Sequence, residues 1–421
     1  MDSTHRLAWR ALLVATLAFA ANFSIWTIYA VLAIDIQAKL SLSALELGVL
    51  LSSPIVSGAV LRVPLGILSE RISPRRLWIA LMWLQLPPLA ILPWIDSFWG
   101  FVWVGLWFGI SGASFTLGVR YVTDWFGSAQ QGFALGVFGV GNAGAAISFI
   151  IIPLLAAQFG WQWTGPLYAI AMLPAILLFT LGAPKGAYQP TAKTKGVNNG
   201  FGFLKQNTVW RYSLYYYFVF GSFLALILWL PQYYMQVYNL DINEAMGFTL
   251  FFVITSSMVR ALGGWFADRY GARAVNWSVF WVCLVCLFFL SYPPTTMTIH
   301  GLEQDVHLRV EVNIWLFTLL IFVIGLAQGL GRASVLRSLY DHYPSDMGRI
   351  GGWVAFVGAL GGCTLPLAFG LIQDLLGIAS GAFMVLYAVL ALCMILMFLA
   401  IRKERYQKAL QQALSNDFYE S

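Results

Sequence analysis

Long apolar runs, separated by short polar segments, fill almost the whole chain. A helix must present about 20 apolar residues to cross a bilayer core that is ~30 Å thick. Twelve runs reach that length, so the pattern predicts an all-α membrane protein with twelve transmembrane helices. The predicted helices lie at about residues 11–34, 45–69, 77–95, 99–120, 131–157, 163–183, 212–238, 245–266, 274–293, 313–336, 350–373 and 379–401.

Two motifs occur once in each half of the chain. Arg62 opens the sequence RVPLG, and Arg260 opens RALGG 198 positions later. Arg120 and Arg337 lie 217 positions apart, each four residues before an aspartate. The change of offset leaves 19 extra residues in the second half, which we assign to an enlarged external loop at 295–313. The repeat predicts two pseudo-symmetric six-helix bundles with a central site between them, an architecture of secondary transporters.

The composition excludes a water-soluble globule. Hydrophobic residues make up 60% of the chain, charged residues 10%, and the mean hydropathy is +0.76, whereas soluble domains carry about 25% charged residues. The net charge of +6 comes from basic residues in short loops, which form no stripe with aromatic residues. We therefore expect the lipid bilayer as partner and no nucleic acid.

The distribution of basic residues predicts the orientation. The segment 185–211 holds five basic residues and no acidic one, as expected for a long cytoplasmic loop under the positive-inside rule. If that loop is cytoplasmic, counting alternate loops places both termini in the cytoplasm. We expect the protein in the cytoplasmic (inner) membrane. The predicted units are an N-terminal six-helix half at 1–184, a cytoplasmic linker loop at 185–211, a C-terminal six-helix half at 212–401 and a cytoplasmic tail at 402–421.

Two arginines lie deep inside predicted helices. Arg62 stands nine residues before Arg71, and Arg260 nine before Arg269, which places each about 13 Å inside the cytoplasmic edge. A charge near the midplane costs about 2.5–3.5 kcal/mol on insertion scales, so such an arginine indicates function. A buried ion pair or a side chain that snorkels to the interface would also explain them. No acidic residue lies in mid-span, which favours an anion site between the halves.

A third arginine, Arg332, needs separate treatment. It lies nine residues before Asp341, and the 217-residue offset makes it the symmetry mate of Phe115. It either faces the same cavity as a third cation or pairs with backbone carbonyls at a helix break near Gly329 and Gly331. The sequence leaves both possibilities open.

Charged pairs near the cytoplasmic ends predict a gate. Each half carries an arginine four residues before an aspartate, and an adjacent acid–arginine pair at the end of the arginine-motif helix. We expect these pairs to join the two halves at the cytoplasmic face. The predicted cytoplasmic gate consists of Glu70, Arg71, Arg120, Asp124, Asp268, Arg269, Arg337 and Asp341.

Two glycine clusters lie inside apolar runs, where each glycine costs about 0.8–1.0 kcal/mol of helix propensity. Close helix packing through small residues explains them directly. Bare backbone also widens a path for a small ion, and both explanations can hold together. The glycine signatures comprise Gly139, Gly141, Gly144, Gly358, Gly361 and Gly362.

Aromatic and amide side chains complete the candidate site. A spacing of four places Tyr216 and Phe220 on one helix face. Together with Phe115 they either pack in the core or sandwich a flat ligand. Asn142 is the polar residue of the first glycine cluster, where its amide could donate to an oxyanion.

Four strings of the sequence stand out, namely SGAVLRVP at 57–64, GASF at 112–115, GVGNAG at 139–144 and GALGG at 358–362. They resemble the nitrate/nitrite porters, the NarK-type branch of the major facilitator superfamily. The resemblance covers both halves and nearly all twelve helices, and it implies the major facilitator fold. The chain differs from many members by carrying Arg332 after the Gly-x-Gly of the tenth helix.

The resemblance implies roles for particular residues. It implies that Arg62 and Arg260 bind the substrate, nitrate or nitrite, and that Asn142 lies beside it. It also implies that Phe115, Tyr216 and Phe220 shape the slot. A planar guanidinium offers a fork of donors that meets two oxygens of a flat anion at once.

We expect transport by alternating access, with the two halves rocking about the arginines. The lack of a mid-membrane acid or histidine favours nitrate/nitrite exchange. The alternatives are a proton-coupled nitrate symporter, a transporter of another small monovalent anion and, from another class, a membrane sensor. Motifs of intramembrane or metal-dependent enzymes are missing, so we expect no enzyme activity, no metal and no cofactor. The protein is expected to function as a monomer.

Overall fold

The computed structural model describes residues 3–42, 44–185, 202–300 and 305–420. Within these ranges twelve helical spans are long and apolar enough to cross a membrane, so the predicted number of transmembrane helices is confirmed. They are His5–Ala33, Glu46–Leu68, Pro74–Trp94, Phe98–Thr123, Ser128–Phe159, Trp161–Gly182, Asn207–Tyr238, Asn243–Tyr270, Ala272–Leu290, Ile314–His342, Arg349–Gln373 and Gly381–Gln407.

Several spans contain more than one regular element. In the first half the elements are α1 (Ser3–Trp26), α2 (Tyr29–Leu40), α3 (Ala44–Val60), α4 (Arg62–Leu68), α5 (Pro74–Leu84), α6 (Leu86–Ala90), η1 (Leu92–Trp94), α7 (Phe98–Phe108), η2 (Gly109–Ala113), α8 (Ser114–Thr123), η3 (Ser128–Gln130), α9 (Gln131–Gly139), η4 (Val140–Ala143), α10 (Gly144–Phe159), η5 (Trp161–Trp163) and α11 (Thr164–Gly182). In the second half they are η6 (Gly202–Lys205), α12 (Asn207–Tyr216), η7 (Tyr217–Gly221), α13 (Ser222–Tyr238), α14 (Ile242–Met258), α15 (Arg260–Tyr270), α16 (Ala272–Leu290), β1 (Thr295–His300), β2 (Asp305–Val310), α17 (Ile314–His342), η8 (Pro344–Asp346), α18 (Arg349–Leu376) and α19 (Gly381–Glu420).

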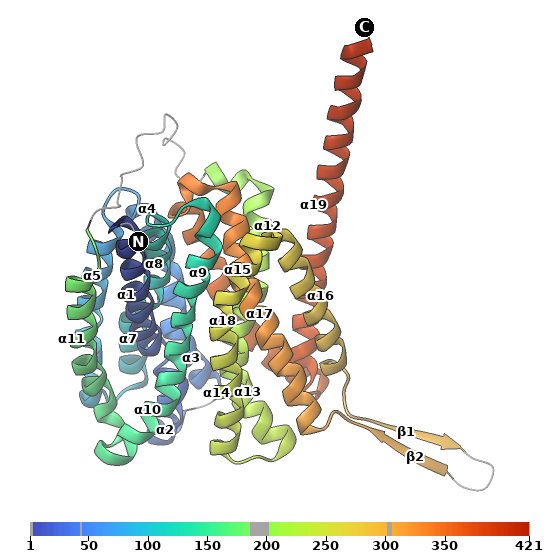
Figure 1. The fold of residues 1–421 in the computed structure, drawn as a ribbon. Helices are drawn as coiled ribbons and strands as arrows, with labels where there is room; N and C mark the ends of the chain where they lie inside the picture. Colours follow the sequence, from blue (N-terminus) through green and yellow to red (C-terminus); the bar gives the residue numbers. More distant parts are fainter. Residues whose placement is uncertain (1–2, 43, 186–201, 301–304, 421) are drawn as a thin grey trace.

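The helices form two bundles that stand side by side. The blue-to-green helices α1 to α11 make one bundle, and the lime-to-red helices α12 to α19 make the other (Figure 1). The start of α1 and the far end of α19 lie at the same end of the molecule, which we call the terminal side. The β-hairpin and the ends of α2 and α10 lie at the opposite end, the hairpin side (Figure 1).

Several helices that face the other bundle are interrupted near their middle. One span breaks at Leu61, between α3 and α4, and its counterpart breaks at Val259, between α14 and α15. The elements η2 and η4 are 3-10 turns inside their spans, and η7 is a π-helical turn. Such irregular turns inside long helices often mark functional sites, because they change which backbone carbonyls are free and where side chains point.

The structure adds detail to three predicted segments at the ends and connections. The segment 295–313, predicted as an enlarged external loop, contains an antiparallel hairpin in which Thr295 pairs with Val310 and His300 with Asp305. Its threonine, valine and isoleucine residues favour strand geometry. The segment 402–421, expected to be a tail, continues α19 as helix to Glu420. The described end of the expected linker is also helical, in η6 and the start of α12, while 186–201 lie outside the described residues.

Candidate functional site

Three arginines converge between the two bundles, and the side chain of each is fully buried. Arg62 begins α4 and Arg260 begins α15, each directly after the break in its span. Arg332 lies in α17. The ring of Phe115 links the first two, because its centroid lies 5.4 Å from Cζ of Arg62 and 5.3 Å from Cζ of Arg260.

The guanidinium of Arg62 is only partly satisfied. Its Nε donates to the carbonyl oxygen of Gly112 at 3.1 Å, and Nη1 donates to that of Ala355 at 2.8 Å. Gly112 lies in the 3-10 turn η2 of the same bundle, whereas Ala355 lies in α18 of the other one. The buried Nη2 has no hydrogen-bond partner in the described part of the chain. Arg62 therefore joins the bundles and keeps a free donor.

Arg260 shows the same incomplete pairing. Its Nη2 donates to the hydroxyl of Tyr216 at 3.4 Å, while the buried Nε finds no partner among the described residues. Gly139 faces this guanidinium so closely that a Cβ there would overlap Nε. The absence of a side chain at Gly139 therefore makes room for the arginine.

Asn142, in η4, lies against two guanidiniums and is fully buried. Because guanidinium nitrogens only donate, the amide oxygen must be the atom that faces them. In this orientation Oδ1 accepts from Nη1 of Arg260 at 2.8 Å and from Nη1 of Arg332 at 2.9 Å. The oxygen of Asn142 is therefore occupied, and the predicted bond to an oxyanion would have to come from the amide nitrogen Nδ2.

Arg332 is held by protein acceptors. Its Nη2 donates to the carbonyl oxygen of Ser256 at 2.5 Å and to the hydroxyl at 2.7 Å, and its Nε donates to the carbonyl oxygen of Gln328 at 3.4 Å. Its Cζ also lies 3.8 Å from the ring centroid of Phe223. These bonds match the predicted contact with backbone carbonyls, but the predicted helix break near Gly329 is wrong, since α17 continues unbroken from Ile314 to His342.

The acceptors of the three guanidiniums share one property. In the described part of the chain they are carbonyl, hydroxyl and amide oxygens, and no carboxylate is among them. The centre of the molecule thus carries positive charge that neighbouring protein acids do not pair with. Such charge in a poor dielectric attracts an anion strongly.

Three aromatic rings lie nearly parallel beside the arginines. Phe115 and Phe220 are 6.1 Å apart with an interplanar angle of 13°, and Tyr216 lies 5.3 Å from Phe220 at 25°. The π-helical turn η7 begins directly after Tyr216, so the predicted spacing of four is kept across an irregular turn. These rings form a flat wall against Arg62, whose Cζ lies 5.3 Å from the centroid of Phe220.

The glycine signatures lie where backbones and rings meet. Gly358 faces the ring of Tyr216, Gly361 faces Gly221, and Gly362 faces Leu224. In the other bundle, Gly141 lies against Phe19 and Gly144 against the carbonyl of Ala20 in α1. A Cβ at any of these positions would overlap its neighbour, so these glycines allow close helix packing. Listed with Gly139, the set is Gly139, Gly141, Gly144, Gly358, Gly361 and Gly362.

On the terminal side, each bundle caps a helix of the other. Glu70, just after α4, accepts from the backbone N–H of Arg349 at the start of α18, at 3.0 Å. Asp268 in α15 accepts from the backbone N–H groups of Gly132 and Phe133 at the start of α9, at 3.0 and 2.7 Å. A carboxylate at a helix N-terminus is favourable. The two caps occupy positions related by the repeat and join the bundles.

The other predicted gate residues act within one bundle or elsewhere. Arg120 pairs with Asp124 one turn along its own helix. Arg337 pairs with Asp341 and, at 2.7 Å, with Asp268, all in the second bundle. Arg71 is exposed, and Arg269 lies over the rings of Trp265 and Tyr270. Glu70 and Asp268 alone among the predicted residues make the caps, and the sequence did not reveal their backbone partners.

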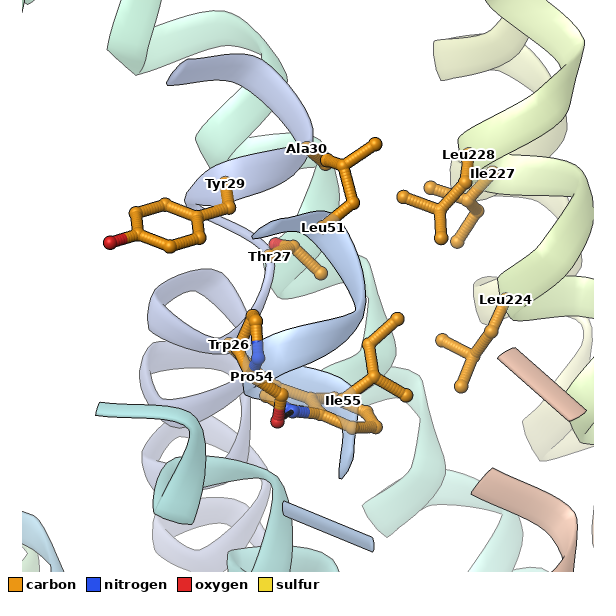
Figure 2. Close-up of a pocket in the computed structure, with 10 residues that line it drawn as sticks. All are labelled: Trp26, Thr27, Tyr29, Ala30, Leu51, Pro54, Ile55, Leu224, Ile227 and Leu228. Carbon is orange, nitrogen blue, oxygen red and sulfur yellow. Dashed lines mark hydrogen bonds between the residues drawn. The ribbon is translucent and has the colours of Figure 1, made fainter. Parts of the chain in front are cut away.

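On the hairpin side, an apolar cleft leads toward the arginines. It is small, and Trp26, Ile55 and Leu51 face Leu224 and Ile227 of α13 across it (Figure 2). The indole of Trp26 lies 5.1 Å from Cζ of Arg62 and donates to the carbonyl of Pro54 at 2.7 Å. Trp26 therefore lines the cleft and also contacts the guanidinium of Arg62.

Some of these residues escaped the sequence analysis. Trp26 belongs to no charged or repeated motif of the sequence. Its indole packs against Gly112 of the GASF string, where a Cβ would overlap the ring. Ser256 is a polar residue inside an apolar run, one turn before Arg260. Its hydroxyl indicated a hydrogen-bond partner for a buried arginine, and in the structure that arginine is Arg332. Carbonyl acceptors such as those of Gly112 and Ala355 leave no trace in a sequence.

Comparisons with known proteins identify the family of the chain. The sequence model of the Major Facilitator Superfamily matches residues 14–302. A protein of Thermus thermophilus named probable nitrate/nitrite antiporter NarK1 is 33% identical, over 97% of this chain and 95% of its own length. The nitrite extrusion protein of Bacillus subtilis (strain 168) is 25% identical, over 93% of this chain and 94% of its own.

A solved structure agrees at the level of the fold. The human organic anion transporter MFSD10 (TETRAN) superposes with a TM-score of 0.73 at 15% identity, covering 94% of this chain and 100% of that one. Twelve membrane helices in two bundles and relatives along nearly the full length identify an integral membrane transporter, not an enzyme. The chain belongs to the NarK-type nitrate/nitrite porter family of the Major Facilitator Superfamily.

Proposed function

We propose that this protein moves nitrate, nitrite or both across the cytoplasmic membrane, with nitrate/nitrite exchange as its mode. One observation carries the proposal. Arg62 Nη2 and Arg260 Nε are buried guanidinium nitrogens without partners in the described chain, and they come from opposite bundles at one aromatic ring. Buried charged donors require acceptors, and an oxyanion between the bundles supplies them.

The shape of the surroundings favours a flat anion. Nitrate is planar, and nitrite presents two similar oxygens, so either can accept from guanidiniums at its edge. The near-parallel rings of Phe115, Tyr216 and Phe220 form a flat wall beside the two donors, and a planar anion fits against such a wall better than a bulky tetrahedral one. Apolar walls also disfavour anions that hold their hydration shell tightly.

Alternating access is part of this proposal, and contacts at the two ends support it. The caps made by Glu70 and Asp268 join the bundles on the terminal side, while a small cleft lies between the bundles at Trp26, on the hairpin side of Arg62. Rocking of one bundle against the other releases the caps and closes the cleft. Arg62 and Arg260 lie between the two ends and alternate in exposure during this motion.

The charge of the empty site favours exchange over proton symport. Without an anion, buried guanidiniums face one another in a poor dielectric, and reorientation of the empty carrier is unfavourable. A bound anion relieves the repulsion in both directions of transport. The described acceptors of these guanidiniums include no carboxylate that a proton could neutralise in place of the anion.

The orientation and domain limits belong to the same proposal. We place the terminal side in the cytoplasm, since basic residues gather there. The six-helix halves then comprise 1–184 and 212–401, joined through 185–211. The basic residues near the terminal ends of helices include Arg71, Arg75, Arg76, Arg269, Arg273, Arg402 and Lys403.

Proteoliposomes test the mode of transport directly. We expect uptake of labelled nitrate into vesicles loaded with nitrite and little uptake into vesicles without an internal anion. An imposed pH gradient should not replace internal nitrite. Strong uptake driven by that gradient into empty vesicles would contradict exchange and favour the proton-coupled symporter.

A further inference from the structure

The bond network around Asn142 crosses from one bundle to the other. Asn142 belongs to the fifth span, whereas Arg260 and Arg332 belong to the eighth and tenth. Its one amide oxygen accepts from both guanidiniums, at 2.8 and 2.9 Å. An oxygen shared by two guanidiniums is the arrangement that an oxyanion would provide. Asn142 thus supplies a protein oxygen where a substrate oxygen could bind.

This network is the innermost part of the contact between α9 and α15. Asp268 caps the start of α9 at the terminal side, and Gly132 approaches the backbone of Gly264 one turn further in. Gly136 then approaches the backbone of Arg260, and Asn142 reaches its side chain. Opening the terminal side separates α9 from α15, which breaks the bonds of Asn142.

The network has no counterpart in the symmetry-related contact between α4 and α18. At the 217-residue offset, Asn142 corresponds to Ala359 and Arg332 corresponds to Phe115. Neither of these residues can form such a bond. There Arg62 donates to the backbone carbonyl of Ala355 instead. The side-chain network is therefore an addition to one of the two contacts and is not required by the fold.

We propose that Arg332, Asn142 and Arg260 form a lock that holds the empty carrier closed on its terminal side. The amide oxygen of Asn142 stands in for a substrate oxygen, and a bound anion competes with it for Arg260. Arg332 is a positioning residue, because its bonds to Ser256 and Gln328 fix it within its own bundle and it acts through Asn142. This inference rests on the proposed function and adds a reason for exchange, since the empty carrier stays locked.

Distances between spin labels test the lock without any substrate. Labels at Ser128 and Ser345, which are exposed on the terminal side of opposite bundles, report opening in the full-length protein with its native cysteines replaced. In nitrate-free and nitrite-free detergent or nanodiscs we expect a closed distance for the unmodified site. Arg332→Met and Asn142→Ala should each raise the ratio of open to closed protein roughly tenfold or more.

A double variant and a matched control make the result specific. Arg332→Met combined with Asn142→Ala should open the protein no further than Asn142→Ala alone, because Asn142→Ala already removes the bond to Arg332. Gln328→Met is the control, since Gln328 is equally buried one turn before Arg332 and its side chain donates to Ser222 of its own bundle. The substitution keeps the backbone carbonyl that accepts from Arg332. It should leave the distances unchanged.

The outcomes separate this inference from the proposed function. Unchanged distances in both single variants, additive opening in the double variant, or equal opening in Gln328→Met would overturn the lock. Two variants on opposite bundles guard against misfolding of either one. Failure of the unmodified protein to take up nitrate or nitrite would contradict the proposed function, whereas the label distances of the empty protein would still decide on the lock.

Discussion

At the scale of single residues, the proposed function rests on two buried donors, Arg62 Nη2 and Arg260 Nε, which have no partner among the described residues. A buried donor without a partner costs about 1–3 kcal/mol, and more when it is charged. The protein satisfies Nε and Nη1 of Arg62 with backbone carbonyls but leaves Nη2 free, and it leaves Nε of Arg260 free. In our proposal this lack of partners marks Arg62 and Arg260 as the binding groups, and Arg332, whose nitrogens donate to protein acceptors, is the contrast.

Gly139 provides the first test at this scale. We expect Gly139→Ala to push the guanidinium of Arg260 aside, because the added Cβ would overlap Nε and Cζ. Overpacking of this kind costs about 1–3 kcal/mol, which weakens nitrate binding roughly tenfold to a hundredfold. Equilibrium binding of labelled nitrate to purified protein measures the change.

Gly127→Ala is the matched control for that variant. An added Cβ at Gly127 meets nothing within 4 Å, and the residue is exposed between α8 and α9. It should bind nitrate as the unmodified protein does. Normal binding by Gly139→Ala would show that Arg260 does not need its present position.

At the scale of elements, the interruptions in the helices expose backbone carbonyls and position the arginine side chains. The 3-10 turn η2 presents the carbonyl of Gly112 to Arg62, and the breaks before α4 and α15 bring the two arginines to equivalent places. The α9 and α18 N-termini receive carboxylates from the opposite bundle, and each such cap contributes about 0.5–2 kcal/mol. Small residues along these contacts let the backbones approach closely.

The cap made by Glu70 predicts a dependence on pH. Burial raises the pKa of Glu70 above its ordinary value of 4.5, while the N–H and the charge of Arg349 lower it, Asp346 raises it and Arg120 lowers it. The closed terminal side therefore binds a proton more tightly than an open one. Closure should strengthen as pH falls toward 4.5 and weaken as pH rises through the raised pKa.

The labels at Ser128 and Ser345 measure this effect between pH 7 and pH 5. Glu70→Gln keeps an acceptor oxygen for the N–H of Arg349 and cannot ionise, so its closed fraction should stay constant over that range. Asp124→Asn is the control and should keep the pH dependence, because Asp124 pairs within its own bundle. A pH response that persists in Glu70→Gln would contradict the assignment to Glu70.

The sequence predicted elements better than it predicted their irregular turns. Apolar length predicted twelve helices, and the depth of Arg62 and Arg260 predicted their burial, because both follow from the thickness of a bilayer. The π-helical turn beside Tyr216, the carbonyl partners of the arginines and the caps depend on backbone geometry, which residue types do not specify. Only a donor role was predicted for the amide of Asn142, because the convergence of Arg260 and Arg332 on its oxygen depends on the tertiary fold.

At the scale of the whole molecule, duplication supplies symmetry and the site departs from it. The paired arginines and the paired caps keep the repeat, so each bundle contributes one arginine and one cap. Asn142 and Arg332 depart from the repeat, because the residues at the corresponding positions are Ala359 and Phe115, which differ from them in chemistry. The offsets of the repeat predicted the extra segment at 295–313, but they carried no information on its hairpin. The paired arginines and caps are thus symmetric, whereas Asn142 and Arg332 are not, and this arrangement agrees with the proposal that both bundles hold one anion.

Nitrate binding by conservative arginine variants tests the central claim most directly. Purified protein is titrated with labelled nitrate, and the variants are Arg62→Lys and Arg260→Lys, with Arg76→Lys at an exposed terminal-side position as control. A lysine keeps the charge but loses the planar fork. We predict saturable binding by the unmodified protein and the control, and binding at least about tenfold weaker in both site variants. Unchanged affinity in Arg62→Lys and Arg260→Lys would contradict coordination of the anion by the two guanidiniums.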